Sequence, residues 1–443
     1  MAMKRPRAYI FNAAGLLSIL AMLAACQERE EILPGKRESV SAVLQGAPRA
    51  DESRAEPIAL PAQSANADAS HGIGTPRYRT THPALNADPR LAWSVRIGAG
   101  DSRRQRIVAD PVVADGLIFT LDSGSLVSAV TTEGALVWQR DLRPARDNEG
   151  DATGGGLAVE GDTLYVALGY GALTAVDAKS GETRWTQQLD ATGSGRPTVY
   201  GGLIYISVGD QSGWALDKKT GRIVWQIGAV EDVSNVLGAP APALTDELAI
   251  FGFGSGELQA VFRQGGLRRW DASVLGERPG RALNQLDDVT GAPVIDRGVV
   301  YAGNQSGRMV AVDIETGLRL WTADEGTVGA MYPIGGSIFA LTDRNNLVRL
   351  DAANGEQIWT VPLPNYLRTR PRRIAAIHAH HGPVVAGGYV RVTSSDGLLR
   401  SFDPRDGSLA AETEIPGGAS TGPIVAGQTL YVVGRSGQLH AFR

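Results

Sequence analysis

The sequence predicts an all-β protein, an eight-bladed β-propeller whose blades are four-stranded antiparallel sheets closed by the N-terminal strand. Two observations predict it. A tryptophan-bearing unit recurs at spacings of 38 to 52 residues from position 93 onward, and the 354 residues from 90 to 443 shared among eight copies give about 44 residues each. Four short strands in a repeat of this length are typical of a propeller blade. The repeated positions are Trp93, Trp138, Trp185, Trp225, Trp270, Trp321 and Trp359, with Ala411 in the equivalent place of a further copy.

Each unit contains two strands joined by a tight turn. In its fullest form, at residues 171–185, an alternating strand ends at Asp177, and Gly181 precedes Trp185 by four positions. An aspartate can accept hydrogen bonds from local amides in such a turn, and glycine tolerates a positive φ. A third strand precedes the unit, and a fourth begins at a recurrent proline, a residue tolerated at the first position of a strand. Those prolines are Pro111, Pro197, Pro242, Pro293, Pro383 and Pro423.

The two ends of the repeat region predict how the ring closes. The last copy stops at residues 439–443, before its fourth strand, whereas the region opens with an isolated strand-like segment at residues 91–95. The N-terminal strand would complete the eighth blade and thereby remove an exposed sheet edge.

Residues 1–25 have the three-part pattern of a secretory signal peptide. Basic residues at positions 4, 5 and 7 lead into a mostly apolar stretch with small residues before Cys26. Residues 23–26 are similar to a bacterial lipoprotein box, which implies lipidation of Cys26; the alternative is an ordinary signal with a free cysteine nearby. More than one acyl chain gives stable anchoring. Gln27 implies, by the same resemblance, sorting to the outer membrane with the protein facing the periplasm.

Residues 26–80 are predicted to be an acylated cysteine followed by a disordered tether. They are rich in Glu, Arg, Ala, Ser and Pro and poor in aromatic residues, so they cannot bury enough apolar surface to fold alone. The expected organisation is therefore a signal peptide at 1–25, a tether at 26–80 and an eight-bladed propeller at 81–443.

Charge and cysteine content exclude several classes of function. The chain has 43 basic and 47 acidic residues, and the acidic excess grows once the basic residues of the signal are set aside. An acidic body argues against binding phosphate backbones, so no nucleic-acid partner is expected. The single cysteine excludes an intrachain disulfide and the cysteine-rich zinc sites.

The repeats resemble those of the pyrroloquinoline quinone (PQQ) family, which residues 215–225 and 311–321 match in full. That family contains eight-bladed quinoprotein dehydrogenases, so a periplasmic PQQ-dependent oxidoreductase is the alternative function. Those enzymes hold the quinone beside a vicinal cysteine pair and chelate calcium near a catalytic carboxylate, and this chain has no cysteine pair. We therefore expect no catalytic residues, no cofactor and no metal, and a structural role for the repeated tryptophans and aspartates.

The lipoprotein box, the tether and the eight copies together resemble the BamB family of outer-membrane assembly lipoproteins. The motif at residues 33–37 looks like that of its alphaproteobacterial members. The resemblance implies a non-catalytic scaffold of the β-barrel assembly (BAM) complex that assists the folding and insertion of β-barrel proteins. Its implied partners are the periplasmic POTRA domains of BamA, with nascent outer-membrane proteins as a further candidate.

Two segments match those that carry the BamA contact in this family, residues 234–242 and 286–290. The resemblance therefore nominates Val236, Leu237, Gly238, Asp287 and Asp288 as partner-binding residues. Both segments lie on long connections, at 226–241 and 271–291, where scaffolds commonly place function. From the residues alone, a solvated loop with a turn-forming aspartate pair explains them equally well.

The densest histidine group is His378, His380 and His381. Alternation would place the first two on one side of a strand, close enough to bind a metal. No other histidine or cysteine is near in sequence, so a surface strand or loop is the favoured interpretation.

Overall fold

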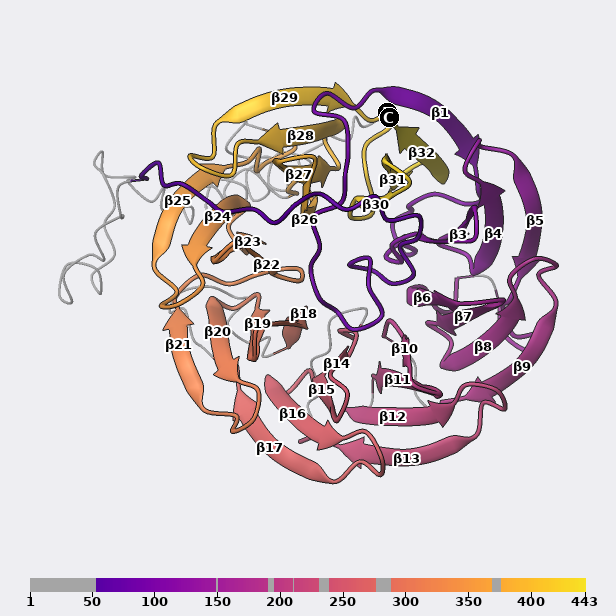
Figure 1. The fold of residues 1–443 in the computed structure, drawn as a ribbon. Helices are drawn as coiled ribbons and strands as arrows, with labels where there is room; N and C mark the ends of the chain where they lie inside the picture. The colour runs from indigo at the N-terminus through magenta and orange to yellow at the C-terminus, as the bar shows by residue number, and fades with distance from the viewer. Residues whose placement is uncertain are drawn as a thin grey trace, which may run out of the picture. The chain divides into compact units, whose positions relative to one another are not determined.

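The structure is a computed structural model that describes residues 53–148, 150–189, 195–209, 211–230, 239–275, 288–368 and 376–443. The signal segment, Cys26 and the motif at 33–37 lie outside the described residues. In the described part, eight four-stranded sheets surround a common axis, each with its first strand innermost (Figure 1). All neighbouring strands within a sheet are antiparallel; Ala215, for example, lies opposite Tyr205 on one side and Trp225 on the other.

Blades are numbered in chain order, and each runs from its inner to its outer strand. Blade 1 contains β2 (Val112–Ala114), β3 (Leu117–Leu121), β4 (Leu126–Thr131) and β5 (Leu136–Asp141), and blade 2 contains β6 (Gly155–Glu160), β7 (Thr163–Leu168), β8 (Ala172–Asp177) and β9 (Thr183–Gln188). Blade 3 contains β10 (Thr198–Tyr200), β11 (Leu203–Val208), β12 (Ser212–Asp217) and β13 (Ile223–Gly228), and blade 4 contains β14 (Ala243–Leu244), β15 (Leu248–Gly252), β16 (Glu257–Phe262) and β17 (Arg268–Ser273). Blade 5 contains β18 (Val289–Asp296), β19 (Val299–Asn304), β20 (Arg308–Asp313) and β21 (Arg319–Ala323), and blade 6 contains β22 (Tyr332–Ile334), β23 (Ser337–Leu341), β24 (Asn346–Asp351) and β25 (Gln357–Pro362). Blade 7 contains β26 (His380–Ala386), β27 (Tyr389–Ser394), β28 (Leu398–Phe402) and β29 (Leu409–Glu414), and blade 8 contains β30 (Ile424–Ala426), β31 (Thr429–Gly434), β32 (Gln438–Phe442) and β1 (Leu91–Arg96).

The N-terminal strand closes the ring, which confirms the predicted fold class. β1 pairs antiparallel with β32, with Trp93 opposite Ala441 and Val95 opposite Leu439. Arg90 and Arg443 also exchange backbone hydrogen bonds of 2.8 and 2.9 Å at the rim of this sheet. The eighth blade thus contains both ends of the repeat region, and unfolding of β1 would open the ring.

The hydrophobic core lies between adjacent blades. The second and third strands are buried on both faces, as in β7 and β8, whereas outer strands such as β9 expose most of their residues. One cluster joins Tyr165 and Leu173 of blade 2 to Ile204 and Trp214 of blade 3. Because each blade is apolar on both faces, only stacking around the axis buries that surface.

Each repeated tryptophan packs against the glycine turn of the next blade. Trp225 of β13 donates its indole N–H to the carbonyl of Arg263 at 2.8 Å. Gly266 in that turn has a φ of +71°, and a Cβ there would meet the indole ring of Trp225 at 2.8 Å. The glycine is therefore required twice, for its backbone conformation and for close approach of the ring. The indole acceptors around the ring are the carbonyls of Thr132, Ala178, Lys218, Arg263, Ile314, Ala352 and Pro404.

Ring closure explains why Ala411 stands where a tryptophan would be expected. Residue 411 lies on β29, the outer strand of blade 7, and the next blade is blade 8. In blade 8 the third strand is C-terminal β32 and the fourth is N-terminal β1, so no turn joins them. A tryptophan at 411 would have no glycine turn to pack against.

Residues 53–83, the N-terminal strap, differ from the expectation of a disordered tether. The strap crosses the middle of the ring (Figure 1) and residues 66–82 contact all eight blades in a full circuit. Ala69 exchanges backbone hydrogen bonds with Val113 of blade 1 at 2.8 and 2.9 Å. The contacts from blade 8 round to blade 7 are Asn66 with Val425, Ala69 with Val113, Ser70 with Val159, His71 with Val199, Arg77 with Asp246, Tyr78 with Ile295, Thr81 with Tyr332, and His82 with Gly388.

Two buried arginines hold the strap and the segment that follows it. Arg349, only 1% exposed, donates to the carbonyls of Glu56 at 2.6 Å and Pro57 at 3.1 Å. Arg391, also buried, donates to the carbonyl of Asn86 at 2.9 Å, and burial lowers its pKa to about 10. Composition does not reveal this docking, because the strap is fixed mainly by backbone polar groups.

The strap makes folding sensitive to acid through His71. Its Nε2 accepts a hydrogen bond from the backbone N–H of Val199 at 3.0 Å, which requires a neutral ring, and burial lowers the pKa from 6.5 to about 3. Between these values only the unfolded chain binds the proton, so stability falls as pH falls, by about 1.4 kcal/mol per unit. We expect the titration of His71 to lower the free energy of unfolding by about 2–3 kcal/mol between pH 6.5 and pH 4.5. Urea unfolding at the two pH values measures this change.

A His71→Gln variant is the control, because its amide oxygen can accept the Val199 bond without titrating. Its loss of stability over the same pH interval should be smaller by that amount. Identical pH dependence in the two proteins would contradict the assignment to His71.

Candidate functional site

A pocket of about 620 Å³ lies at the mouth of the central channel, and we call it the axial pocket. Part of its wall comes from residues that precede or begin the inner strands of blades 1 to 6, such as Val108, Thr153 and Ala241, and part from residues at the ends of second strands, such as Val208 and Gly252. The strap contacts the opposite ends of these inner strands, for example Val113 and Val199. The strap also reaches the axial pocket, because a Cβ on its Gly72 would lie 3.4 Å from the guanidinium of the pocket residue Arg196.

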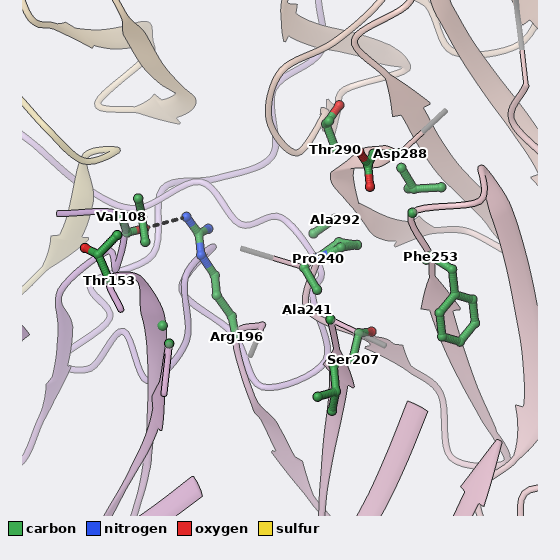
Figure 2. Close-up of a pocket in the computed structure, with 18 of the residues that line it drawn as sticks. Val108, Thr153, Arg196, Ser207, Pro240, Ala241, Phe253, Asp288, Thr290 and Ala292 are labelled. Carbon is green, nitrogen blue, oxygen red and sulfur yellow. Dashed lines mark hydrogen bonds between the residues drawn. The ribbon is translucent and has the colours of Figure 1, made fainter. Parts of the chain in front are cut away.

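Arg196 is the most prominent charged side chain of the axial pocket (Figure 2). Its guanidinium forms an ion pair with Asp110 at 2.7 Å and donates to the carbonyl of Val108 at 3.1 Å. Asp110 raises the pKa of Arg196, so the arginine stays charged. Asp110 also accepts a hydrogen bond from the backbone N–H of Gly422 at 2.9 Å. The pair thus ties blades 1, 3 and 8 together across the channel.

Sequence reasoning missed this pair, although the repeat contains a signal for it. Asp110 and Arg196 each stand immediately before a recurrent proline, at equivalent positions of blades 1 and 3. The same position in blades 4 and 5 holds Ala241 and Ala292, which also line the axial pocket. A charged residue at a position that otherwise carries small residues indicates a group that faces the axis.

The structure brings parts of the two predicted partner segments together at one wall of the axial pocket. Pro240 of the first segment and Val289 of the second flank Gly252, where a Cβ would lie 3.1 Å from Pro240 Cγ and 2.9 Å from Val289 Cγ1. Val236, Leu237, Gly238 and Asp287 lie outside the described residues. The connections that carry them therefore converge at the start of the inner strands of blades 4 and 5.

Asp288 differs from the exposed loop residue that the aspartate pair suggested. It is only 6% exposed and borders the axial pocket beside Thr290 (Figure 2). Its neighbours are fixed by the propeller: Val289 N–H donates to the carbonyl of Phe253 at 3.1 Å, and Thr290 Oγ donates to that of Thr327 at 2.7 Å. Because strand β18 begins at Val289, these hydrogen bonds hold Asp288 at the start of the strand, where it borders the axial pocket.

Within the histidine group, His380 is buried and its ring is used for hydrogen bonding. Nδ1 of His380 lies 2.7 Å from Ser394 Oγ and Nε2 lies 2.8 Å from the carbonyl of Pro364, so both ring nitrogens are engaged. Burial lowers the pKa of His381 to about 4, which keeps that ring neutral. Within the described ranges, no group of three His, Cys, Asp or Glu residues is placed to hold a metal ion.

The described residues also contain no helix that is long and apolar enough to cross a membrane.

Comparison with known proteins gives a consistent family match. The family model described as "Outer membrane protein assembly factor BamB" matches residues 122–361 and 349–443. A BamB of Yersinia pestis is 25% identical over 80% of this chain and 88% of its own length.

Solved structures share the fold at lower identity. The crystal structure of BamB from Moraxella catarrhalis has a TM-score of 0.65 at 20% identity, covering 80% of this chain and 99% of that one. A quinohemoprotein alcohol dehydrogenase from Pseudomonas putida HK5 has a TM-score of 0.68 at 16% identity, covering 85% of this chain and 80% of that one. At these identities the likeness concerns the architecture alone, and architecture does not determine function.

Proposed function

The chain belongs to the family of the outer membrane protein assembly factor BamB, and from that premise we propose that it is a non-catalytic scaffold of the BAM complex. In this proposal it binds periplasmic POTRA domains of BamA and thereby assists the folding and insertion of β-barrel proteins. Nascent outer-membrane proteins are a further candidate partner.

The convergence of residues 239–242 and 288–290 at one wall of the axial pocket carries this proposal. Two connections that are far apart in sequence are placed side by side by Pro240 and Val289. A rigid ring presents such connections at a fixed spacing, which keeps the cost of ordering them on binding low. A partner can therefore contact both connections at once.

The alternative, a PQQ-dependent oxidoreductase, is supported only by the shared fold. Its relatives hold the quinone beside a vicinal cysteine pair, and Cys26 is the only cysteine in this chain. Arg196, one of the charged residues that line the axial pocket, already forms an ion pair with Asp110. These residues do not fit a quinone and calcium site. Purified protein should accordingly show no dye reduction after quinone and calcium are added.

We also propose that acylation at Cys26 anchors the protein to the outer membrane, facing the periplasm. The family match supports outer-membrane association, and the sequence of residues 23–26 supports the site of attachment. Two or more acyl chains would make this attachment stable.

The decisive test changes three of the nominated partner-binding residues. The combined variant Val236→Ser, Leu237→Ser and Asp287→Arg is expected to weaken binding to the purified periplasmic region of BamA at least tenfold, because a few central residues dominate most interfaces. Asp288 stays unchanged, since its burial makes it a poor probe of binding. Affinity is measured by titration, and the charge reversal should matter less at high salt.

A matched control replaces exposed apolar residues elsewhere. Val224 on β13 is 54% exposed and Leu136 on β5 is 46% exposed, so Val224→Ser with Leu136→Ser should leave the affinity unchanged. Both variants should unfold cooperatively near the wild-type midpoint. Wild-type affinity in a folded segment variant would refute this placement of the interface.

A further inference from the structure

The outer strand of blade 5 exposes apolar side chains at a β-bulge, in residues 318–323, which we call the blade 5 edge. The pairing of β20 with β21 shifts register between Ala311 and Val312, which makes Leu320 an extra residue on the outer strand. Leu320 is 53% exposed, and Leu318 is 68% exposed. A bulge leaves its extra residue unpaired within the sheet. Within the described part of the chain, no backbone hydrogen bond from outside this sheet reaches the Leu320 carbonyl.

The equivalent edge of the neighbouring blade 6 is covered by the chain itself (Figure 1). The register shift in β25 makes Ile358 the extra residue there. The backbone N–H of Arg54, in the strap, donates to the Ile358 carbonyl at 2.9 Å. Ile358 is only 1% exposed, and it belongs to an apolar cluster against which Ile58 and Leu60 of the strap pack. An extended segment therefore pairs with a bulged outer edge of this ring in spite of the bulge.

Blade 5 carries the open edge that matches this covered one most closely. The extra residue is valine in blades 1 and 3, arginine in blades 2 and 4, and alanine in blades 7 and 8. Only blades 5 and 6 have a leucine or isoleucine there, and Ile358 is covered whereas Leu320 is open. Exposed apolar side chains that lie together mark interaction sites, so the blade 5 edge lacks an occupant of the kind that blade 6 already has.

We propose that the blade 5 edge binds an extended segment of an unfolded polypeptide whose residues alternate between apolar and polar. The segment donates a backbone N–H to the Leu320 carbonyl, as Arg54 does to Ile358, and lays apolar side chains over Leu318 and Leu320. In strand addition of this kind, main-chain hydrogen bonds supply affinity and the contacts of alternate side chains supply specificity.

The chemistry of the occupant follows from the strap. From Glu56 to Leu60 its residues are alternately part-buried and exposed, with Ile58 and Leu60 on the side that packs against the ring. Strands of membrane β-barrels alternate apolar and polar residues in the same way. The inference therefore rests on the proposed function and deepens it, because unfolded β-barrel proteins contain many such segments. A folded partner has already paired most of the strand N–H groups that this edge requires.

The test titrates a labelled peptide with the full mature chain, residues 26–443 without acylation. The peptide alternates valine and threonine, and two further versions carry N-methyl groups on either its even or its odd residues. One of these versions lacks every N–H that can face β21, so it should bind at least about fivefold more weakly than the unmodified peptide. The variant Leu318→Asp with Leu320→Asp should lose at least about fivefold in affinity for the unmodified peptide, because the apolar contact is replaced by charge.

The matched control is Leu367→Asp with Ile377→Asp. These residues are 49% and 54% exposed and lie outside the outer strands, so the control should keep wild-type affinity for the peptide. Equal weakening in the two variants, or undiminished binding of both methylated peptides, overturns edge pairing in favour of general apolar attraction. Wild-type affinity in a cooperatively folded Leu318/Leu320 variant overturns the placement on blade 5.

Two further measurements keep this inference separate from the scaffold role and from self-association. The Leu318/Leu320 variant should bind the periplasmic region of BamA with wild-type affinity, so loss of the peptide site leaves the scaffold proposal standing. Sedimentation should give the same molecular mass for the variant and the wild-type chain. A dimer that is lost in the variant would make a second copy of this chain the occupant and would overturn the inference.

Discussion

Deletion of residues 53–83 is expected to lower the free energy of unfolding by more than about 5 kcal/mol. The strap contributes Tyr78, which is 1% exposed, and removal of a buried aromatic side chain costs about 3–5 kcal/mol. Arg349 would lose the carbonyls of Glu56 and Pro57, and a buried polar group without its partner costs about 1–3 kcal/mol more. Denaturant unfolding monitored by tryptophan fluorescence measures the change.

Deletion of residues 27–52 is the control, because the described strap and all its contacts remain. That variant should unfold at the wild-type denaturant midpoint. Equal stability of the two deletion variants would show that the strap adds nothing to the ring. If Tyr78→Ala and Arg349→Met each lower the free energy of unfolding and together account for the loss seen on deletion, the effect belongs to these side chains and not to the backbone contacts.

Most of the fold could be predicted from the repeat, because the same short-range sequence signals specify every blade. The alternating strands, the aspartate turns and the glycine before each tryptophan are all short-range signals. Closure by β1 followed from one missing strand at the C-terminus. The strap was not predictable, since Ala69 and His71 are fixed by backbone partners on different blades and composition carries no signal for such contacts.

The candidate site was only partly predictable. The resemblance placed residues 240 and 289 in one interface, and their packing around Gly252 brings them together. The burial of Asp288 could not be inferred, because the direction of a side chain at the start of β18 is set by its neighbours in blades 4 and 5. The Arg196–Asp110 pair was missed because 86 positions separate residues that meet only at the axis.

The other large expected effect concerns the packing of tryptophan on glycine between blades. Gly355 has a φ of +76°, and a Cβ there would lie 2.6 Å from the indole ring of Trp321. Gly355→Ala should cost about 1–2 kcal/mol for the left-handed backbone. Displacement of the ring should add about 1–3 kcal/mol, with about 1 kcal/mol for the indole hydrogen bond to Ala352 at 3.0 Å. The total expected loss is about 3–6 kcal/mol.

Gly336 of the same blade separates these contributions. Its φ is +77°, almost identical, but nothing lies within 4 Å of a Cβ built there. Gly336→Ala should therefore lose only the backbone contribution. In a Trp321→Ala background, itself expected to cost about 3–5 kcal/mol, the cost of Gly355→Ala should fall to that of Gly336→Ala. Urea unfolding of the four variants measures the coupling. If Gly355→Ala costs the same with and without the indole ring, the ring does not pack on that glycine.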